Sequence, residues 1–287
     1  MKDNDITISV MRAEDAVVAL SLSAAEGWNQ TASDWEFLIT YPGSICVAAV
    51  CEKEIVATTT SIHYSNRLAW IGMVLVKKTY RGRGLSKLLL DHVFGKLRSF
   101  SSIKLDATPQ GQQVYTKFGF KNEYRIARMV HTALPDIAVP GDEVLPEPAR
   151  PEHIPGIVTL DEAVFGINRA PLIEMLIKVC PHKAWVLVRN GRITGFALGR
   201  DGSKYHHIGP VTALTQSGAH LLLMHALDKL TGRPVVIDVL CDKEELMYSL
   251  TAAGFNTQRY FTRMYKGGNP FPGVSSHMFT ICGPELG

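Results

Sequence analysis

Apolar and polar residues follow two periods along the first half of the chain, and their order predicts alternating strands and helices. A period of two residues with many β-branched side chains predicts strands, and a period of about 3.6 predicts amphipathic helices. The predicted strands are residues 6–12, a hairpin over 44–64 that turns at 52–54, 68–76, 102–108 and 122–131. The predicted helices are residues 14–26, 33–41, 85–97 and 109–118. The order βααβββαβαβ predicts an α/β fold, a mixed sheet with helices on both faces.

The second half of the chain repeats this pattern. The matching segments are KLLLDHVFGKL (87–97) with HLLLMHALDKL (220–230), KFGF (117–120) with AAGF (252–255), and IARM (126–129) with FTRM (261–264). All separations lie between 132 and 139 residues, which predicts two tandem copies of one fold. We expect a first domain over residues 1–134, a proline-containing linker over 135–148, and a second domain over 149–287. The tail segment HMFTIC should add a strand to one of the two sheets.

Composition narrows the class of protein. The chain has 287 residues, of which 46% are hydrophobic, and a net charge of +3. This charge is too small to favour nucleic acid or an anionic membrane as a partner. No apolar run approaches the roughly 20 residues of a membrane span, and the amino terminus has no signal-peptide core. The five cysteines show no metal-ligand spacing, so we expect a reduced, cytoplasmic protein with no metal.

The segment VKKTYRGRGLS (76–86) joins a predicted strand to a predicted helix and has two glycines around one arginine. One interpretation is a plain turn on a basic surface. A second is the dinucleotide fingerprint GxGxxG, with Asp106 as the ribose-binding acid. Lys87 at the third glycine position argues against that fingerprint. A third is an anion site, because free N–H groups at a helix start attract anions and glycines let a phosphate approach the backbone.

A strand, the motif V-x-x-x-Y-R-G-x-G-L-S, an amphipathic helix, a buried strand and a short helix ending in Y-x-K-F-G-F follow one another over residues 68–120. This series resembles the GNAT family of acyl-CoA-dependent N-acetyltransferases, by motif over residues 6–131 and by the repeat over 149–266. The family's pyrophosphate loop, [QR]-x-x-G-x-[GA], corresponds here to Arg81, Gly82, Arg83, Gly84, Leu85 and Ser86. Ser86 replaces the family's Gly or Ala, and Lys78 a usual proline. The resemblance implies that the loop holds the diphosphate of acetyl-CoA.

The resemblance also implies where the pantetheine arm lies. In the family, the strand before the loop separates from its neighbour, and pantetheine occupies the gap between them. The corresponding strand edge here is Met73, Val74, Leu75 and Val76. A backbone N–H near Val74 or Leu75 would polarise the acetyl carbonyl.

Tyr115 corresponds to the family's tyrosine that protonates the leaving thiolate of coenzyme A. It stands in the pattern Y-x-K-F-G-F, which raises it above an ordinary core tyrosine. Thr108 replaces the family's asparagine at a pantetheine contact. No general base is evident from the sequence, and Glu26, Asp34 and His63 are candidates by position.

The second copy lacks the residues that imply cofactor binding in the first. Its corresponding loop has one glycine, Gly218, and no arginine, and Leu250 stands where Tyr115 would be. We therefore expect one coenzyme A per chain, in the first half. Two equivalent loops, 27–35 and 165–171, should help to form the acceptor pocket. Their vicinity supplies the predicted acceptor contacts Trp28, Asn29, Asp34, Asp161 and Arg169.

These observations favour an N-acetyltransferase that moves the acetyl group of acetyl-CoA to the primary amine of a small molecule, by direct attack in a ternary complex. The alternatives are a non-catalytic protein that senses acyl-CoA, and an acyltransferase with another acyl-CoA or an oxygen acceptor. Since the acceptor pocket should draw on both halves, we expect residues 1–137 alone to bind acetyl-CoA but to acetylate poorly.

Overall fold

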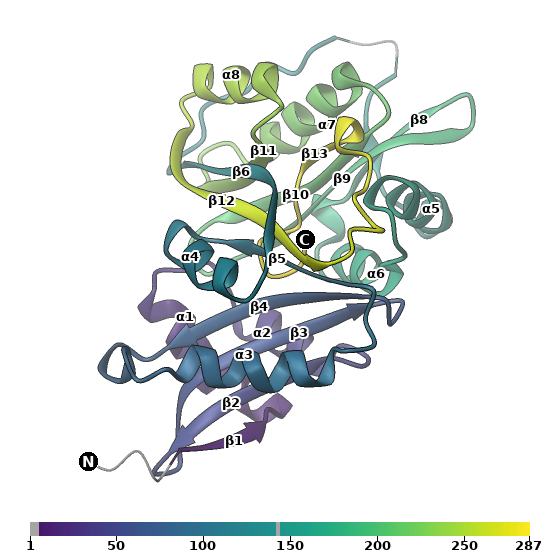
Figure 1. Ribbon diagram of the computed structural model, residues 1–287. Coiled ribbons are helices and arrows are strands. Elements are labelled where there is room, and N and C mark those ends of the chain that lie inside the picture. Colours follow the sequence, from purple (N-terminus) through teal and green to yellow (C-terminus); the bar gives the residue numbers. More distant parts are fainter. Residues whose placement is uncertain (1–5, 142–143) are drawn as a thin grey trace.

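The computed structural model describes residues 6–141 and 144–287, which form two α/β halves joined edge to edge (Figure 1). The first half contains β1 (Ile6–Val10), α1 (Ala16–Ala25), α2 (Ala32–Thr40), β2 (Ile45–Cys51), β3 (Glu54–Tyr64), β4 (Leu68–Val76), α3 (Leu85–Lys96), β5 (Ser102–Ala107), α4 (Pro109–Lys117) and β6 (Lys121–His131). The second contains β7 (Glu147–Pro148), α5 (Ile154–Phe165), α6 (Ala170–Val179), β8 (Trp185–Arg189), β9 (Arg192–Asp201), β10 (His206–Ala213), α7 (Gln216–Asp228), β11 (Val235–Leu240), α8 (Glu244–Ala252), β12 (Asn256–Gly267) and β13 (Met278–Thr280).

The predicted order of elements is confirmed in both halves, and local sequence explains several boundaries. Glu52 and Lys53 have φ angles of 49° and 68°, as a two-residue turn between β2 and β3 requires. Thr108 caps α4, because its Oγ1 accepts a hydrogen bond from the N–H of Gly111 at 3.1 Å. Gly119, with φ of 85°, follows the end of that helix.

The described strands form one continuous sheet, in the order β1-β2-β3-β4-β5-β12-β6-β11-β13-β10-β9-β8-β7. The last repeated strand of each half has exchanged places with its counterpart. β12 pairs with β5, β6 pairs with β11, and β6 and β12 lie side by side in the middle of the sheet.

We expected residues 122–131 to close the first half, and this placement is wrong: they lie in β6, which pairs with β11 of the second half. The hydrophobic pattern identifies a strand and its buried face but does not identify the sheet edge that it joins. Because the two halves are repeats, both edges offer an equivalent partner.

Two buried ion pairs join the exchanged strands. Arg128 on β6 pairs with Asp238 on β11, and Arg263 on β12 pairs with Asp106 on β5. Each pair is bidentate, with both N–O distances 2.8 Å. Such a pair is specific in geometry, so it favours this register of the exchange. The carboxylate of Asp106, considered above as a ribose-binding acid, is held by Arg263.

Helices cover both faces of the sheet, as predicted. In the first half, α3 packs on one face and α1 and α2 on the other. In the second half, α7 and α8 cover one face, and α5 and α6 cover the other. The core beneath α1 and α2 is continuous with that beneath α5 and α6, where the rings of Trp70 and Phe165 lie 6.0 Å apart. The two halves therefore share a hydrophobic core.

The C-terminal strand β13 fills a gap in the second half. β10 and β11 pair only over His206–Ile208 and Val235–Ile237 and then separate. β13 lies between the separated parts and pairs with both. The prediction of an added tail strand is thus confirmed, and its place is the second half of the shared sheet.

Candidate functional site

The first half has an equivalent gap between β4 and β5, with no described strand in it. These strands pair only over Leu68–Trp70 and Ser102–Lys104. From Ile71 to Val76, β4 therefore has a free edge on this side. Met73 has φ of 47°, and the register between β4 and β3 shifts beside it. A bulge of this kind bends a strand and redirects its neighbours.

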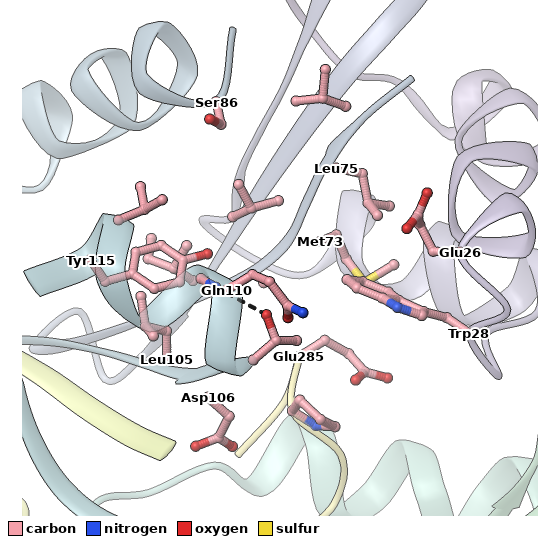
Figure 2. A pocket seen from close by; sticks show the side chains of 18 of the residues that line it. Glu26, Trp28, Met73, Leu75, Ser86, Leu105, Asp106, Gln110, Tyr115 and Glu285 are labelled. Atoms are coloured by element: carbon pink, nitrogen blue, oxygen red, sulfur yellow. Dashed lines mark hydrogen bonds between the residues drawn. The ribbon is translucent and has the colours of Figure 1, made fainter. Parts of the chain in front are cut away.

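A cleft of about 580 Å³ occupies this gap (Figure 2). Its lining comes from the end of α1, β4, the loop before α3, the junction of β5 and α4, the exchanged strands and the C-terminal tail. The volume is typical of small-molecule sites. Among the residues predicted for coenzyme A, the lining includes Met73, Val74, Leu75, Val76, Arg81, Gly82, Gly84, Leu85, Ser86 and Thr108.

The start of α3 presents backbone N–H groups to this cleft. Gly82 and Gly84 have φ angles of 78° and 76°, and nothing lies within 4 Å of the place that a Cβ would take at either residue. Gly84 is the N-cap, no side chain caps the helix, and the first turn contains no acidic residue. These free N–H groups and the helix dipole form a site suited to an anion such as a diphosphate.

The corresponding helix start in the second half is capped by its own side chain. Thr215 Oγ1 accepts a hydrogen bond from the N–H of Gly218 at 3.1 Å. A Cβ on Gly218 would lie 3.0 Å from that oxygen and 3.2 Å from Leu187, so this glycine is packed within the protein. Since β13 also fills the adjacent gap, the described second half offers neither the free helix start nor the open slot.

The two arginines of the loop have different surroundings. Arg81 lines the mouth of the cleft and forms an ion pair with Glu26 at the end of α1. Arg83 stacks on the ring of Tyr80, with 4.8 Å between the guanidinium carbon and the ring centroid. Arg83 is not part of the cleft lining, so of the predicted loop residues it alone stands apart from the site.

Tyr115 on α4 faces the cleft from the side opposite Trp28 (Figure 2). Its ring packs against Phe120, with centroids 5.8 Å apart. Gly111 leaves room for the ring, since a Cβ there would lie 3.0 Å from Tyr115 Cε2. Burial raises the pKa of Tyr115 above its usual value, so the phenol is protonated at neutral pH, as a proton donor must be.

Trp28 is the one predicted acceptor contact that lines the cleft. Asn29 is buried and bonds the backbone around Tyr205 in the second half. Asp34 accepts hydrogen bonds from Thr31 at the start of α2 and pairs with Arg200. Both side chains therefore hold loops in place, and the structure does not bring them to the cleft.

Asp161 and Arg169 lie elsewhere as well. They form a buried bidentate pair with N–O distances of 2.8 and 2.9 Å. Arg169 also donates to the backbone oxygen of Gly287 at 2.7 Å. This pair fastens the C-terminal tail, and neither residue lines the cleft. The acceptor site proposed below therefore does not include Asn29, Asp34, Asp161 or Arg169.

Several polar lining residues were missed from the sequence: Gln30, Gln110, Arg128, Arg259 and Glu285. Arg128 and Arg263 stand at the same position of the repeated segments IARM and FTRM, and this repetition was the signal in the sequence. In the structure each of them forms a buried ion pair. Glu285 follows the end of the repeat and has no counterpart in the first copy. Only the path of the C-terminal tail in the structure shows that Glu285 reaches the cleft.

Of the three candidates for a general base, only Glu26 lines the cleft. Its carboxylate pairs with Arg81. His63 packs beside Phe100, with ring centroids 4.5 Å apart, and burial lowers its pKa to about 4. His63 and Asp34 are not part of the lining.

Within residues 6–141 and 144–287, no three His, Cys, Asp or Glu side chains gather closely enough to suggest a metal site. The adjacent histidines of β10 have separate partners: His206 contacts Asp201, and His207 contacts Asp238. No helix in the same described ranges has the length and apolar character needed to cross a membrane.

Comparison with known protein families gives a match in each half. Residues 15–120 match the model described as "Acetyltransferase (GNAT) family", and residues 157–280 match the one described as "Acetyltransferase (GNAT) domain". The first match includes the loop before α3 and the helix that carries Tyr115, and it ends just before β6.

Similar proteins also extend over both halves. The chain is 25% identical to holothin acyltransferase of Pseudoalteromonas sp. (strain SANK 73390), over 92% of this chain and 88% of that protein. A Pyrococcus horikoshii structure has a TM-score of 0.80 at 22% identity, covering 100% of this chain and 98% of that one. A tandem GNAT protein from the clavulanic acid biosynthesis pathway has a TM-score of 0.64 at 13% identity, covering 91% and 98%.

Proposed function

Since this chain is an acyltransferase of the GNAT family with two GNAT domains in tandem, we propose that its first half transfers the acetyl group of acetyl-CoA to the primary amine of a small molecule. The observation that carries the proposal is the open gap between β4 and β5, which connects the uncapped start of α3 with Tyr115. We assign residues 1–134 to the catalytic domain, 135–148 to the linker and 149–287 to a degenerate second domain.

The residues present fit coenzyme A. Gly82 and Gly84 leave clear space in front of the free N–H groups of α3, which suits a diphosphate. The free edge of β4 from Met73 to Val76 would hold the pantetheine arm by backbone hydrogen bonds, with Thr108 across the cleft. Bound in this way, acetyl-CoA would supply an activated thioester for acyl transfer.

Tyr115 is the proposed general acid. When the amine nitrogen bonds to the acetyl carbon, the C–S bond breaks and the sulfur leaves as a thiolate. Tyr115 would give its phenolic proton to that sulfur. Ordinary pKa values of about 10 for a phenol and about 8.5 for a thiol make this transfer uphill by roughly 2 kcal/mol, and the raised pKa of Tyr115 adds to that cost. A donor that acts only as the C–S bond breaks tolerates such a cost.

The amine must lose a proton before it attacks. Among the three general-base candidates named from the sequence, Glu26 is the one that lines the cleft. Its ion pair with Arg81 holds it at the mouth of the cleft. We propose that Glu26 takes this proton, directly or through water. The free edge of β4 near Val74 and Leu75 would place an N–H at the acetyl carbonyl oxygen.

The decisive experiment is release of free thiol from acetyl-CoA with a panel of amino acids, polyamines, aminoglycosides and peptide amino termini. Amine-dependent release, with a product heavier by one acetyl group, supports the proposal. Parallel assays with propionyl-CoA and longer acyl-CoAs, and with alcohol acceptors, identify the acyl group and the acceptor atom. Tight binding of acetyl-CoA without turnover on any acceptor would favour a sensing protein instead.

A further inference from the structure

The C-terminal tail of the second half ends beneath the cleft of the first half. After β13, residues 281–287 cross to β3 and β4, where the Nε1–H of Trp70 donates to the backbone oxygen of Pro284 at 3.0 Å. The hydroxyl of Tyr64 donates to the backbone oxygen of Leu286. Arg169 holds the oxygen of Gly287. Three buried side chains thus fix the tail, and Pro284 and Glu285 become part of the cleft lining.

Glu285 brings a carboxylate to this place. Its Oε1 accepts hydrogen bonds from Gln30 Nε2 at 2.9 Å and from Arg200 Nη2 at 2.7 Å. None of the described groups bonds its Oε2. The side chain is only 4% exposed although it lines the cleft.

Glu285 shares its guanidinium partner with a second carboxylate. Arg200 lies between two carboxylates, Glu285 at 2.7 Å and Asp34 at 2.9 Å. Burial alone lowers the pKa of Arg200, but these two carboxylates raise it above its usual value. Arg200 therefore serves two carboxylates, and Arg259 lines the same cleft. The nearby guanidinium of Arg128 is already paired with Asp238.

Gln30, beside Glu285, also has an acceptor atom without a hydrogen-bond donor among the described residues. Gln30 is 4% exposed, and its Oε1 is buried without a hydrogen-bond partner. Its amide nitrogen is the group that donates to Glu285, so the orphaned oxygen lies beside that carboxylate and Gln30 lines the cleft. A buried acceptor without a donor costs about 1–3 kcal/mol. Two neighbouring acceptors, one of them a carboxylate, suit a ligand with several N–H donors and a positive charge.

This pair lies close to the bend in β4. A Cβ on Gly72 would lie 3.1 Å from both Cα and Cβ of Glu285, and Gly72 directly precedes Met73, where β4 bends. Figure 2 shows Glu285 between Tyr115 on one side and Trp28 on the other. An amine held at Glu285 would therefore lie near the part of the β4 edge that the proposed function assigns to the acetyl group.

We propose that Glu285 and Gln30 bind the acceptor amine as its ammonium, so that the degenerate half supplies the charge that selects the substrate. This inference rests on the proposed function and narrows its substrate class to small primary amines that are cationic at neutral pH. The acceptor binds as an ammonium and gives up one proton before its nitrogen attacks. Glu285 recognises and positions this group, and the removal of its proton stays with Glu26, as in the proposed function.

The test compares Glu285→Gln with the wild type on a panel of simple amines: ethanolamine, 1,4-diaminobutane, lysine and glucosamine. For every amine that the wild type acetylates, we expect the KM to rise at least tenfold, the kcat to stay within about threefold, and acetyl-CoA affinity to be unchanged. Glu285→Asp keeps the charge and should recover part of the KM. Glu123→Gln removes a buried carboxylate paired with Lys104, outside the lining, and should leave the KM unchanged.

Gln30→Met provides a second variant if Glu285→Gln does not fold, and it should also raise the KM for the amine. An unchanged KM in Glu285→Gln, or in Gln30→Met when it alone folds, would overturn the inference and leave the proposed function intact. A wild type that binds acetyl-CoA but releases no thiol with any amine would overturn both. That outcome is distinct because it is seen before any substitution is made.

Discussion

Among single residues, Tyr115 has the proposed role that is most directly testable. Tyr115→Phe removes the hydroxyl that we propose as the proton donor but keeps the ring that packs on Phe120. We expect kcat to fall at least tenfold, roughly 1.4 kcal/mol or more in the barrier, with little change in acetyl-CoA affinity. Steady-state kinetics and calorimetry measure the two effects. Tyr248→Phe, on the equivalent helix α8 and 77% exposed, is the matched control, and unchanged turnover in Tyr115→Phe would leave Tyr115 a packing residue.

His63 gives a prediction about stability and pH. Burial lowers its pKa from 6.5 to about 4 in the folded protein, so the folded state keeps this ring neutral while the unfolded chain takes up a proton. The stabilisation is complete above pH 6.5 and is lost as the pH falls towards 4, by up to about 3 kcal/mol. The free energy of unfolding should therefore fall between pH 7 and pH 4.5.

His63→Leu should flatten that pH dependence, measured by urea unfolding at each pH. The same substitution at His182, which is exposed on the surface, should leave the slope as it is in the wild type. Because burial also lowers the pKa of His207, some slope should remain in His63→Leu. A wild-type slope in His63→Leu would show that the ring is not held neutral.

At the scale of elements, the exchange of β6 and β12 makes each half depend on the other. Without β12, the edge of β5 would be bare and Asp106 would be a buried charge without Arg263. Removing one partner of a buried ion pair costs about 3–5 kcal/mol. The expectation that residues 1–137 alone bind acetyl-CoA therefore does not follow from the structure, because that fragment lacks a strand of its own sheet.

A split within the linker tests this dependence. Residues 1–141 and 142–287, expressed separately, should be insoluble or unfolded, and expressed together they should purify as a one-to-one complex that unfolds cooperatively. Circular dichroism and analytical ultracentrifugation measure both properties. A soluble, cooperatively folded monomer of residues 1–141 would mean that the exchanged strand is dispensable, and β6 could then close its own half.

The elements themselves were largely predictable from the sequence, whereas their partners were not. The apolar run at Leu68–Val76 and the Thr108-Pro109 start of α4 depend on neighbouring residues only, and both elements are confirmed. The partner of β6 depends on residues over 100 positions away. For the same reason Gly82, Gly84 and Tyr115 could be chosen as site candidates from a local motif, while Glu285 reaches the cleft by a path that no local pattern encodes.

At the scale of the whole molecule, the two halves have equivalent gaps in the sheet, and only the gap of the second half is filled by a described strand. In the second half, β13 lies between β10 and β11, and the oxygen of Ile281 is 2.1 Å from where a Cβ on Gly209 would be. The tail thus fills, in the second half, the gap whose equivalent between β4 and β5 is open in the first half. It then continues to the first cleft, where it contributes Glu285. One segment therefore fills the gap of the second half and lines the cleft of the first half.

This asymmetry predicts one coenzyme A per chain, bound in the first half. Gly84→Val should weaken acetyl-CoA binding about 100-fold, roughly 3 kcal/mol, because the side chain would enter the space in front of the N–H groups of α3. The matched control is Gly232→Val, since Gly232 has φ of 75° against 76° at Gly84 and also has nothing within 4 Å of a Cβ. Both substitutions impose the same backbone strain, but only Gly84 borders the cleft.

Gly218, the nearest glycine of the second copy by sequence, is a poorer control, because a Cβ there would press on Thr215 and Leu187. Titration calorimetry of the wild type should give a stoichiometry near one, Gly232→Val should match the wild type in affinity, and Gly84→Val should not. A stoichiometry near two would mean that the tail leaves the gap between β10 and β11 when coenzyme A binds. Equal losses in the two variants would trace the effect to backbone strain and remove the loop from the binding site.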